Sequence, residues 1–144
     1  MPAFSMTAPN LPRIIENSPL ARIARWKLGQ TNVAMVLGRS IHLSGVTRAD
    51  FLRDASWVAH ELCHIRQVQE HGLMGFLWKY LVESARVGYY ANRFEVEARE
   101  AGRRDAAQVA VWLGIAPPQG HGRGGAEPSQ PSATAADARP DTVA

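Results

Sequence analysis

The alternation of hydrophobic and polar positions first marks out two short segments of the chain. The runs NVAMVLG and RSIHLSG are rich in β-type residues and are bounded by Gly38 and Gly45. In the second run, Ile41 and Leu43 alternate with polar neighbours, as expected for a strand with one buried face. These features predict a small β-hairpin.

Helical spacing of apolar residues begins before this hairpin and resumes after it. The segment SPLARIARWKLG offers Ser18 as an N-cap and Pro19 at the first helical position, and the helix is expected to end near Gly29. Beyond the hairpin, residues 48–71 have the pattern of one or two helices that stop at Gly72, a natural C-terminal signal.

Two further helices complete the predicted fold. Residues 73–86 form an apolar helix with only a narrow polar strip, for which burial in the core is the favoured explanation. The last helix begins after Asn92 and runs to about Gly114. The sequence therefore predicts a mostly helical α+β fold with a minor sheet.

Composition limits this fold to part of the chain. With 144 residues, 46% of them hydrophobic and 20% charged, the chain has the composition of one small globular domain. Residues 117–144 are dominated by Pro, Gly, Ser, Ala and Thr and are predicted to be disordered. The predicted domain is residues 18–116, preceded by an N-terminal segment of residues 1–17.

Charge and targeting signals narrow the class of protein. The 16 basic residues are nearly all arginines scattered among 13 acidic residues, so no nucleic-acid partner is predicted. No transmembrane stretch or secretion signal is recognisable, and the single cysteine, Cys63, cannot form an intramolecular disulfide. A cytoplasmic location is expected.

The segment WVAHELCHIRQ contains the pattern H-E-x-x-H. Residues four apart on a helix lie one above the other, so His60 and His64 can reach one zinc ion. Glu61 follows the first histidine and can take a proton from a water whose pKa the metal has lowered. The alternative is that the two histidines only make hydrogen bonds on a partly buried face.

The helical wheel separates the histidines from the apolar residues of this segment. His60, His64, Gln67 and His71 share one stripe, and the apolar arc is formed by Trp57, Val58, Leu62, Ile65 and Val68. His71 lies about 10 Å beyond His64 along the helix axis, too far to share its ion. Cys63 is expected to be a small buried residue and not a ligand.

A zinc site needs a third protein ligand, which NRFEVEARE supplies as Glu95, Glu97 or Glu100. Glu95 falls within the apolar arc of the last helix and is the favoured ligand, Glu97 lies at its edge, and Glu100 faces solvent. A capping box between Asn92 and Glu95 is the competing explanation. Asp105 lies in the same arc, where it either orients a ligand histidine or pairs with an arginine.

The segments AHELCHIRQ and NRFEVEA together resemble the minimal zincin metallopeptidases of the glutamate-zincin type. The similarity is closest to the small bacterial H-E-L-x-H-x-x-Q domains related to the core domain of extracellular contractile injection systems, and it covers about residues 20–102. It implies zinc ligands His60, His64 and Glu95, with Glu61 as general base. The membrane-associated peptidase version has an acid where this chain has Arg99.

The resemblance also implies how a peptide substrate would bind. In larger zincins, an edge strand beside the active-site helix pairs with an extended substrate, and residues 33–36 or 39–43 could supply that edge. The donor for the oxyanion is unidentified, and the polar candidates are Tyr89, Tyr90, Arg93 and His42.

Two functions are therefore expected for this chain. The first is a zinc-dependent metallopeptidase acting on a peptide or protein substrate. The second is a zincin-fold module without activity that binds a protein partner or, peripherally, a membrane through residues 73–90, whose apolar arc is wider than a surface helix needs.

Overall fold

The computed structural model describes residues 10–115, and within them it contains a three-stranded sheet. The strands are β1 (Arg13–Ile15), β2 (Val33–Leu37) and β3 (Ser40–Ser44). β3 is central, antiparallel to β2 and parallel to β1. The predicted hairpin is confirmed as β2 and β3, whereas β1 is an additional strand in the segment placed outside the domain. The predicted disordered tail, residues 117–144, lies outside the described residues.

The strand order decides which run could pair with an extended peptide. β3 has a partner on both sides, so residues 39–43 do not form an edge, contrary to one of the two expectations. β2 lies at the edge of the sheet, so residues 33–36 are the expected run that can pair with an extended peptide.

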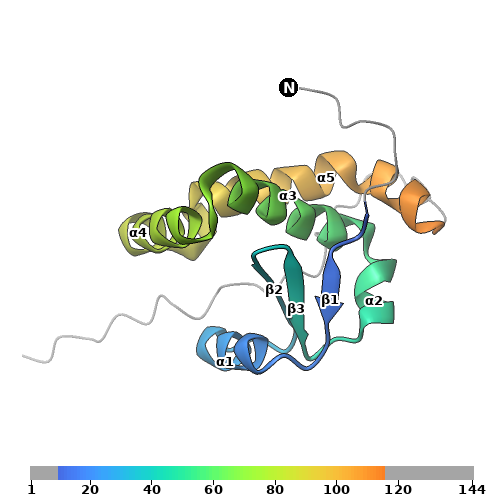
Figure 1. Cartoon of the computed structure of the whole chain (residues 1–144), viewed down its shortest axis with the longest axis horizontal. Helices are drawn as coiled ribbons and strands as arrows, with labels where there is room; N and C mark the ends of the chain where they lie inside the picture. Colours follow the sequence, from blue (N-terminus) through green and yellow to red (C-terminus); the bar gives the residue numbers. More distant parts are fainter. Residues whose placement is uncertain (1–9, 116–144) are drawn as a thin grey trace, which may run out of the picture.

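Helices cover both faces of this sheet (Figure 1). α1 (Pro19–Leu28) lies against one face, while α2 (Arg48–Arg53) and α3 (Ala55–His71) pack on the side of the main core. Strand alternation directs Ile41 and Leu43 into that core, where both are fully buried. The predicted segment of residues 48–71 is thus two helices, separated at Asp54, whose side chain caps α3 by accepting from Trp57 N.

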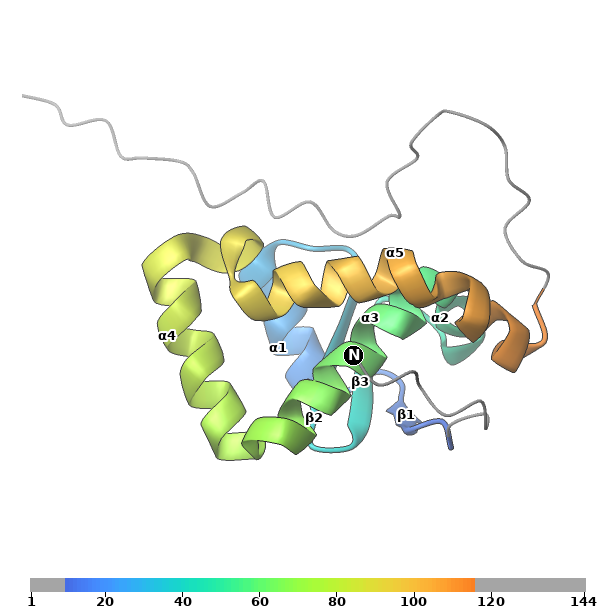
Figure 2. The ribbon, with the colours of Figure 1, turned by 90° about the horizontal axis from the view of Figure 1, so that it is seen from above.

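α4 (Leu73–Ala91) and α5 (Arg93–Leu113) complete the fold. Seen from above, α3, α4 and α5 form the three sides of a triangle (Figure 2). The predicted helix ends are confirmed at Gly72 and Asn92, and α4 contains a break at Gly88 (φ 82°, ψ 164°) that was not predicted. The mostly helical α+β fold is confirmed.

Small residues let α3 and α5 approach closely. Cys63, Ala98 and Ala101 are buried together between the two helices. A Cβ added at Gly102 would lie 3.0 Å from the backbone oxygen of Ser56, so even a methyl group there would require the neighbouring atoms to move by a few tenths of an ångström. This contact holds the first turns of α5 close to the histidines of α3.

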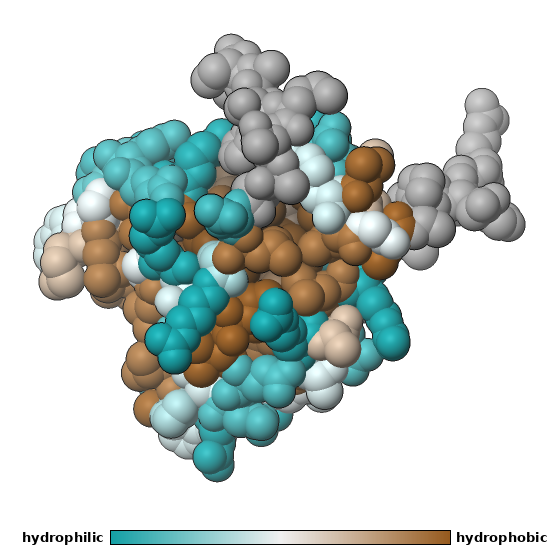
Figure 3. Space-filling view, turned by 45° about the vertical axis from the view of Figure 1, so that its right-hand side comes forward, coloured by the Kyte–Doolittle hydropathy of each residue, from teal (hydrophilic) through white to brown (hydrophobic). Residues whose placement is uncertain are grey.

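A considerable part of the hydrophobic surface remains exposed. Figure 3 shows a hydrophobic area on one face of the molecule, bordered by hydrophilic residues. On α4 only Phe76 is buried, while Trp78 is 71% exposed, so the expectation that residues 73–86 are mainly core is wrong. Within residues 10–115 no helix combines the length and the apolar character needed to cross a bilayer.

Candidate metal centre

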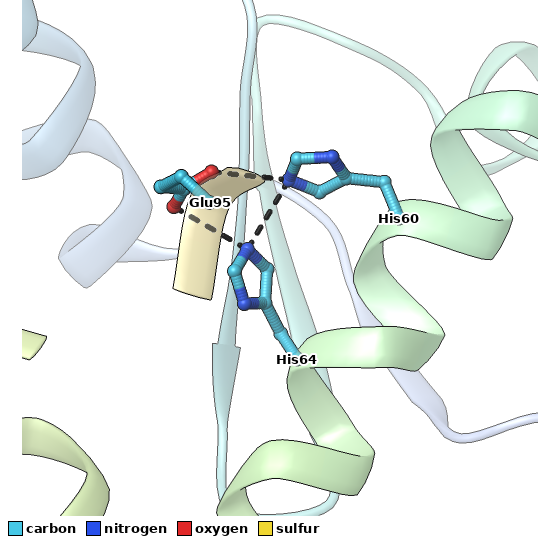
Figure 4. Close-up of side chains that lie close together, drawn as sticks. All are labelled: His60, His64 and Glu95. Carbon is cyan, nitrogen blue, oxygen red and sulfur yellow. Dashed lines mark hydrogen bonds and ion pairs between the residues drawn. The ribbon is translucent and has the colours of Figure 1, made fainter. Parts of the chain in front are cut away.

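Three side chains from two helices converge inside the triangle of α3, α4 and α5. His60 Nε2 and His64 Nε2 lie 3.1 Å apart. Each faces one oxygen of Glu95, with His60 Nε2 3.3 Å from Oε2 and His64 Nε2 3.3 Å from Oε1 (Figure 4). All three residues are buried, and their ligand atoms lie within 4.8 Å of one another. The three residues expected to bind the ion are therefore brought together.

The start of α5 positions Glu95 without using it as a cap. Asn92 Oδ1 accepts from Phe94 N at 2.9 Å, and its Nδ2 donates to Ser84 Oγ and to the backbone oxygen of Tyr80 in α4. The carboxylate of Glu95 faces the histidines and the Tyr80 hydroxyl instead of the backbone of Asn92. The cap is thus made by Asn92 alone, and the capping-box explanation for Glu95 is wrong.

Tyr80 fixes one oxygen of Glu95. Its hydroxyl donates to Glu95 Oε1 at 2.6 Å. Burial and the charge of Glu95 raise the pKa of Tyr80 far above its usual value, so the phenol keeps the proton that it donates. Tyr80 was not among the candidate residues, although its spacing of four from the buried Phe76 places it on the inner face of α4.

The group is electrostatically complementary before any ion binds. Burial by itself raises the pKa of Glu95, but the two histidine rings, each 3.3 Å from one of its oxygens, outweigh this effect and lower that pKa below its usual value. Burial lowers the pKa of His64, but the hydrogen bond and charge of Glu95 raise it to about 9. The buried carboxylate is thus held as an anion, and a positive partner for it is either the protonated ring of His64 or a bound metal ion in its place.

Gln67 orients the ring of His64. Its Nε2 donates to Phe94 O at 3.1 Å and to Glu97 Oε2 at 2.9 Å, which leaves Oε1 as the acceptor for His64 Nδ1 at 2.9 Å. In the neutral ring, which is the form that binds a metal ion, this contact places the proton on Nδ1 and leaves the lone pair on Nε2. An outer partner of this kind typically fixes the tautomer of a metal-binding histidine.

Removing this partner gives a prediction for metal affinity. Gln67→Leu keeps the volume of the side chain but lets the His64 ring turn and change tautomer, so affinity for a divalent ion is expected to fall about 10- to 100-fold. The measurement is competition with a chromophoric chelator. Gln69→Leu, at an exposed position of the same helix, should leave affinity unchanged. Equal affinity in folded Gln67→Leu and the parent protein would contradict the positioning role.

Glu61 is buried beside the three converging side chains. Its Oε1 accepts from Trp57 Nε1 at 3.2 Å. Burial raises its pKa, and the charges of His60, His64 and Glu95 are close enough to act on that pKa. A carboxylate with a raised pKa beside a cluster of possible ligands has the properties of a general base.

The other acidic candidates are engaged elsewhere. Arg66 and Gln67 both donate to Glu97, which is therefore not the third member of the group. Glu100 is exposed, as expected. Asp105 pairs with Arg104 at 2.8 Å, so the arginine alternative is confirmed and Asp105 orients no histidine.

His71 and Cys63 lie outside the group, as predicted. His71 Nδ1 is 3.1 Å from Lys79 Nζ, and its ring packs against Phe94. Cys63 is buried between α3 and α5, and burial raises the pKa of its thiol to about 11. A thiol that stays protonated is a poor metal ligand.

Of the four candidate oxyanion donors, only Tyr89 lies near the group. Burial and the charges of Glu95 and Glu61 raise its pKa above the usual value. His42 contacts Ser18 Oγ at 2.7 Å beside α1. Arg93 lies over the ring of Phe94, and Tyr90 is exposed with Arg99 over its ring.

The donor set fits a metal ion. Two histidine nitrogens and one carboxylate are a common protein ligand set for a catalytic divalent ion with an open position. Two buried carboxylate oxygens, Oε2 of Glu61 and Oε2 of Glu95, accept no hydrogen bond within residues 10–115. Buried carboxylate oxygens normally have partners, so their arrangement here is explained if a cation and a water molecule bind between them.

Comparison with known proteins does not assign the chain to a family. No family model, no curated protein and no solved structure matches it. The resemblance to the zincins therefore rests on the two sequence segments quoted above, and the metal centre rests on the geometry of this chain.

Proposed function

We propose that this protein is a zinc-dependent peptidase with a minimal zincin-like domain. The observation that carries the proposal is the convergence of His60, His64 and Glu95, with Glu61 buried beside them and its Oε2 without a hydrogen bond. These three residues would hold the ion as ligands. Zinc is favoured over other ions because two imidazoles and one carboxylate are a typical catalytic zinc set.

Glu61 carries the proton transfers of the proposed reaction. A bound zinc ion would supply Lewis acidity, which lowers the pKa of a water molecule and polarises the scissile carbonyl. Glu61 Oε2 accepts a proton from the attacking water, and the same oxygen returns it to the amine nitrogen as the C–N bond breaks. Burial raises the pKa of Glu61, which favours the protonated form that this second step needs.

Other residues of the chain would position the substrate. The edge of β2 offers backbone groups that can pair with an extended peptide. The Tyr89 hydroxyl is the proposed donor to the oxyanion, because the charges of Glu61 and Glu95 both act on its pKa and it keeps its proton at neutral pH. Tyr80 holds the third ligand through its hydroxyl.

Metal analysis tests the proposal. Purified protein is expected to contain about one zinc ion per chain by mass spectrometry and to hydrolyse members of a quenched fluorescent peptide library. Treatment with a chelator should stop hydrolysis, and added zinc should restore it. Protein that neither retains zinc on purification nor takes it up afterwards would contradict the proposal.

The exposed face of α4 favours a second candidate function. Met74, Trp78 and Leu81 are large apolar side chains with most of their surface exposed. In this candidate the domain holds an ion without catalysis and binds a protein partner, or a membrane peripherally, through residues 73–90. Stoichiometric zinc with no turnover of any library peptide would favour it over the peptidase.

A further inference from the structure

One continuous segment of the chain carries a net positive charge because it contains no acidic residue. Residues 17–49 contain no aspartate or glutamate and five basic residues, of which Arg22, Arg25 and Lys27 belong to α1. This segment therefore carries +5, and the rest of the chain, with a total of +3, carries −2. The acid-free segment forms α1, β2 and β3, and three of its five basic residues lie on α1.

The outward face of α1 is apolar at its centre. Ala21 is the buried residue of this helix, and at about 100° per residue Trp26 and Ile23 lie about 140° and 200° around the axis from it. Trp26 is 80% exposed and Ile23 is 57% exposed. A surface helix normally places polar residues opposite its buried side. In α1, this position is taken by a tryptophan and an isoleucine.

Basic side chains border this apolar centre. Arg22 and Lys27 are exposed and lie on either side of the Ile23 and Trp26 pair around the helix. An open hollow along α1 is lined by Arg22, Arg25, Trp26 and Gln30, among others. This face of α1 thus has an apolar centre, a cationic border and a recess lined by guanidinium groups. Guanidinium groups are well suited to bind a phosphate group.

We propose that α1 docks this protein on the surface of an anionic lipid bilayer. Helices that lie in the bilayer interface have tryptophan and aliphatic residues on one face with basic residues beside them. The cationic border is complementary to anionic headgroups, and Ile23 and Trp26 enter the boundary between headgroups and acyl chains. A nucleic acid would use the positive charge but would give the aliphatic Ile23 and Leu20 no apolar surface to enter.

Docking through α1 is compatible with access to the metal centre. α1 covers the sheet face opposite to α3, which carries His60 and His64 (Figure 1). A bilayer in contact with α1 therefore leaves the interior of the α3, α4 and α5 triangle uncovered by lipid. This inference does not depend on the peptidase proposal, because none of the residues of α1 belongs to the candidate metal centre.

Vesicle binding by the full chain tests the inference. The protein is expected to sediment with phosphatidylcholine vesicles that contain about 30% phosphatidylglycerol, to bind pure phosphatidylcholine at least about tenfold more weakly, and to release as salt is raised. Trp26→Ala and the double variant Arg22→Glu, Lys27→Glu should each weaken binding at least about tenfold. All these positions are exposed, and circular dichroism verifies that the variants remain folded.

An exposed apolar residue outside both candidate surfaces provides the control. Val111 on α5 is 65% exposed, and Val111→Ala should bind anionic vesicles like the parent. The inference is overturned if the parent does not bind anionic vesicles or if Val111→Ala loses binding while Trp26→Ala retains it. It is also overturned if sedimentation velocity shows that the parent is a dimer and that Trp26→Ala is a monomer. A third contrary result would be that the charge-reversal variant loses binding to a DNA duplex but still binds vesicles.

Discussion

Glutamine in place of Glu95 is expected to lower zinc affinity at least about 100-fold, more than the loss of an outer partner such as Gln67. The variant keeps the size of the side chain and its contact with Tyr80 but removes the anionic ligand that faces His60 and His64. Affinity is measured by chelator competition at neutral pH, with zinc content after purification as a second measurement.

Glu97→Gln is the control for this experiment. Glu97 lies on the same helix two residues away, where Arg66 and Gln67 bind it outside the candidate metal centre. Its replacement should leave zinc affinity within a few fold of the parent. Comparable losses in the two variants, or full zinc binding by Glu95→Gln, would show that Glu95 is not the third ligand. The N-terminus of α5 is capped by Asn92, so neither Glu95→Gln nor Glu97→Gln should lower the stability of this helix.

Replacing Glu61 with glutamine should separate metal binding from catalysis. The amide cannot take a proton from water, so hydrolysis is expected to fall at least about 100-fold while zinc stays bound. The amide can still accept from Trp57 Nε1, which preserves the position of the side chain. The measurement is initial rate on the best substrate of the peptide library, together with zinc content of the same sample.

Glu70→Gln is the matched variant on α3. Glu70 is exposed near the end of the same helix and pairs with Arg66, so its replacement should change neither rate nor zinc content. If Glu61→Gln hydrolysed peptides as fast as Glu70→Gln, Glu61 would not be the base. Loss of zinc from Glu61→Gln would instead indicate that its carboxylate contributes to the binding of the ion.

Local signals account for most of the fold that the sequence predicts. Thr47, Asp54 and Asn92 each accept a backbone hydrogen bond at the start of a helix, and such caps act within three residues. β1 has no comparable signal. It consists of three residues, and its partner β3 is supplied by a distant part of the chain, so that only tertiary structure makes it a strand.

The candidate site shows the same division between local and distant information. The spacing of His60 and His64 follows from the helix period, which the sequence contains. The choice of Glu95 over Glu97 follows from the same period, because Glu95 lies in the apolar arc of α5 and is buried, whereas Glu97 lies at the edge of that arc and is exposed. The roles of Tyr80 and Gln67 depend instead on contacts between helices, which periodicity does not specify.

The contact at Gly102 has a consequence for the distance between the two helices that carry the candidate ligands. Ser56, which Gly102 touches, lies one helical turn before His60, so atoms in contact set the smallest separation that these helices can have. A methyl group at position 102 would require a shift of a few tenths of an ångström, either of α5 or of the Ser56 main chain, and this shift would be passed on to the geometry between His60 and Glu95. The spacing of the three converging side chains therefore depends in part on a residue that has no side chain of its own.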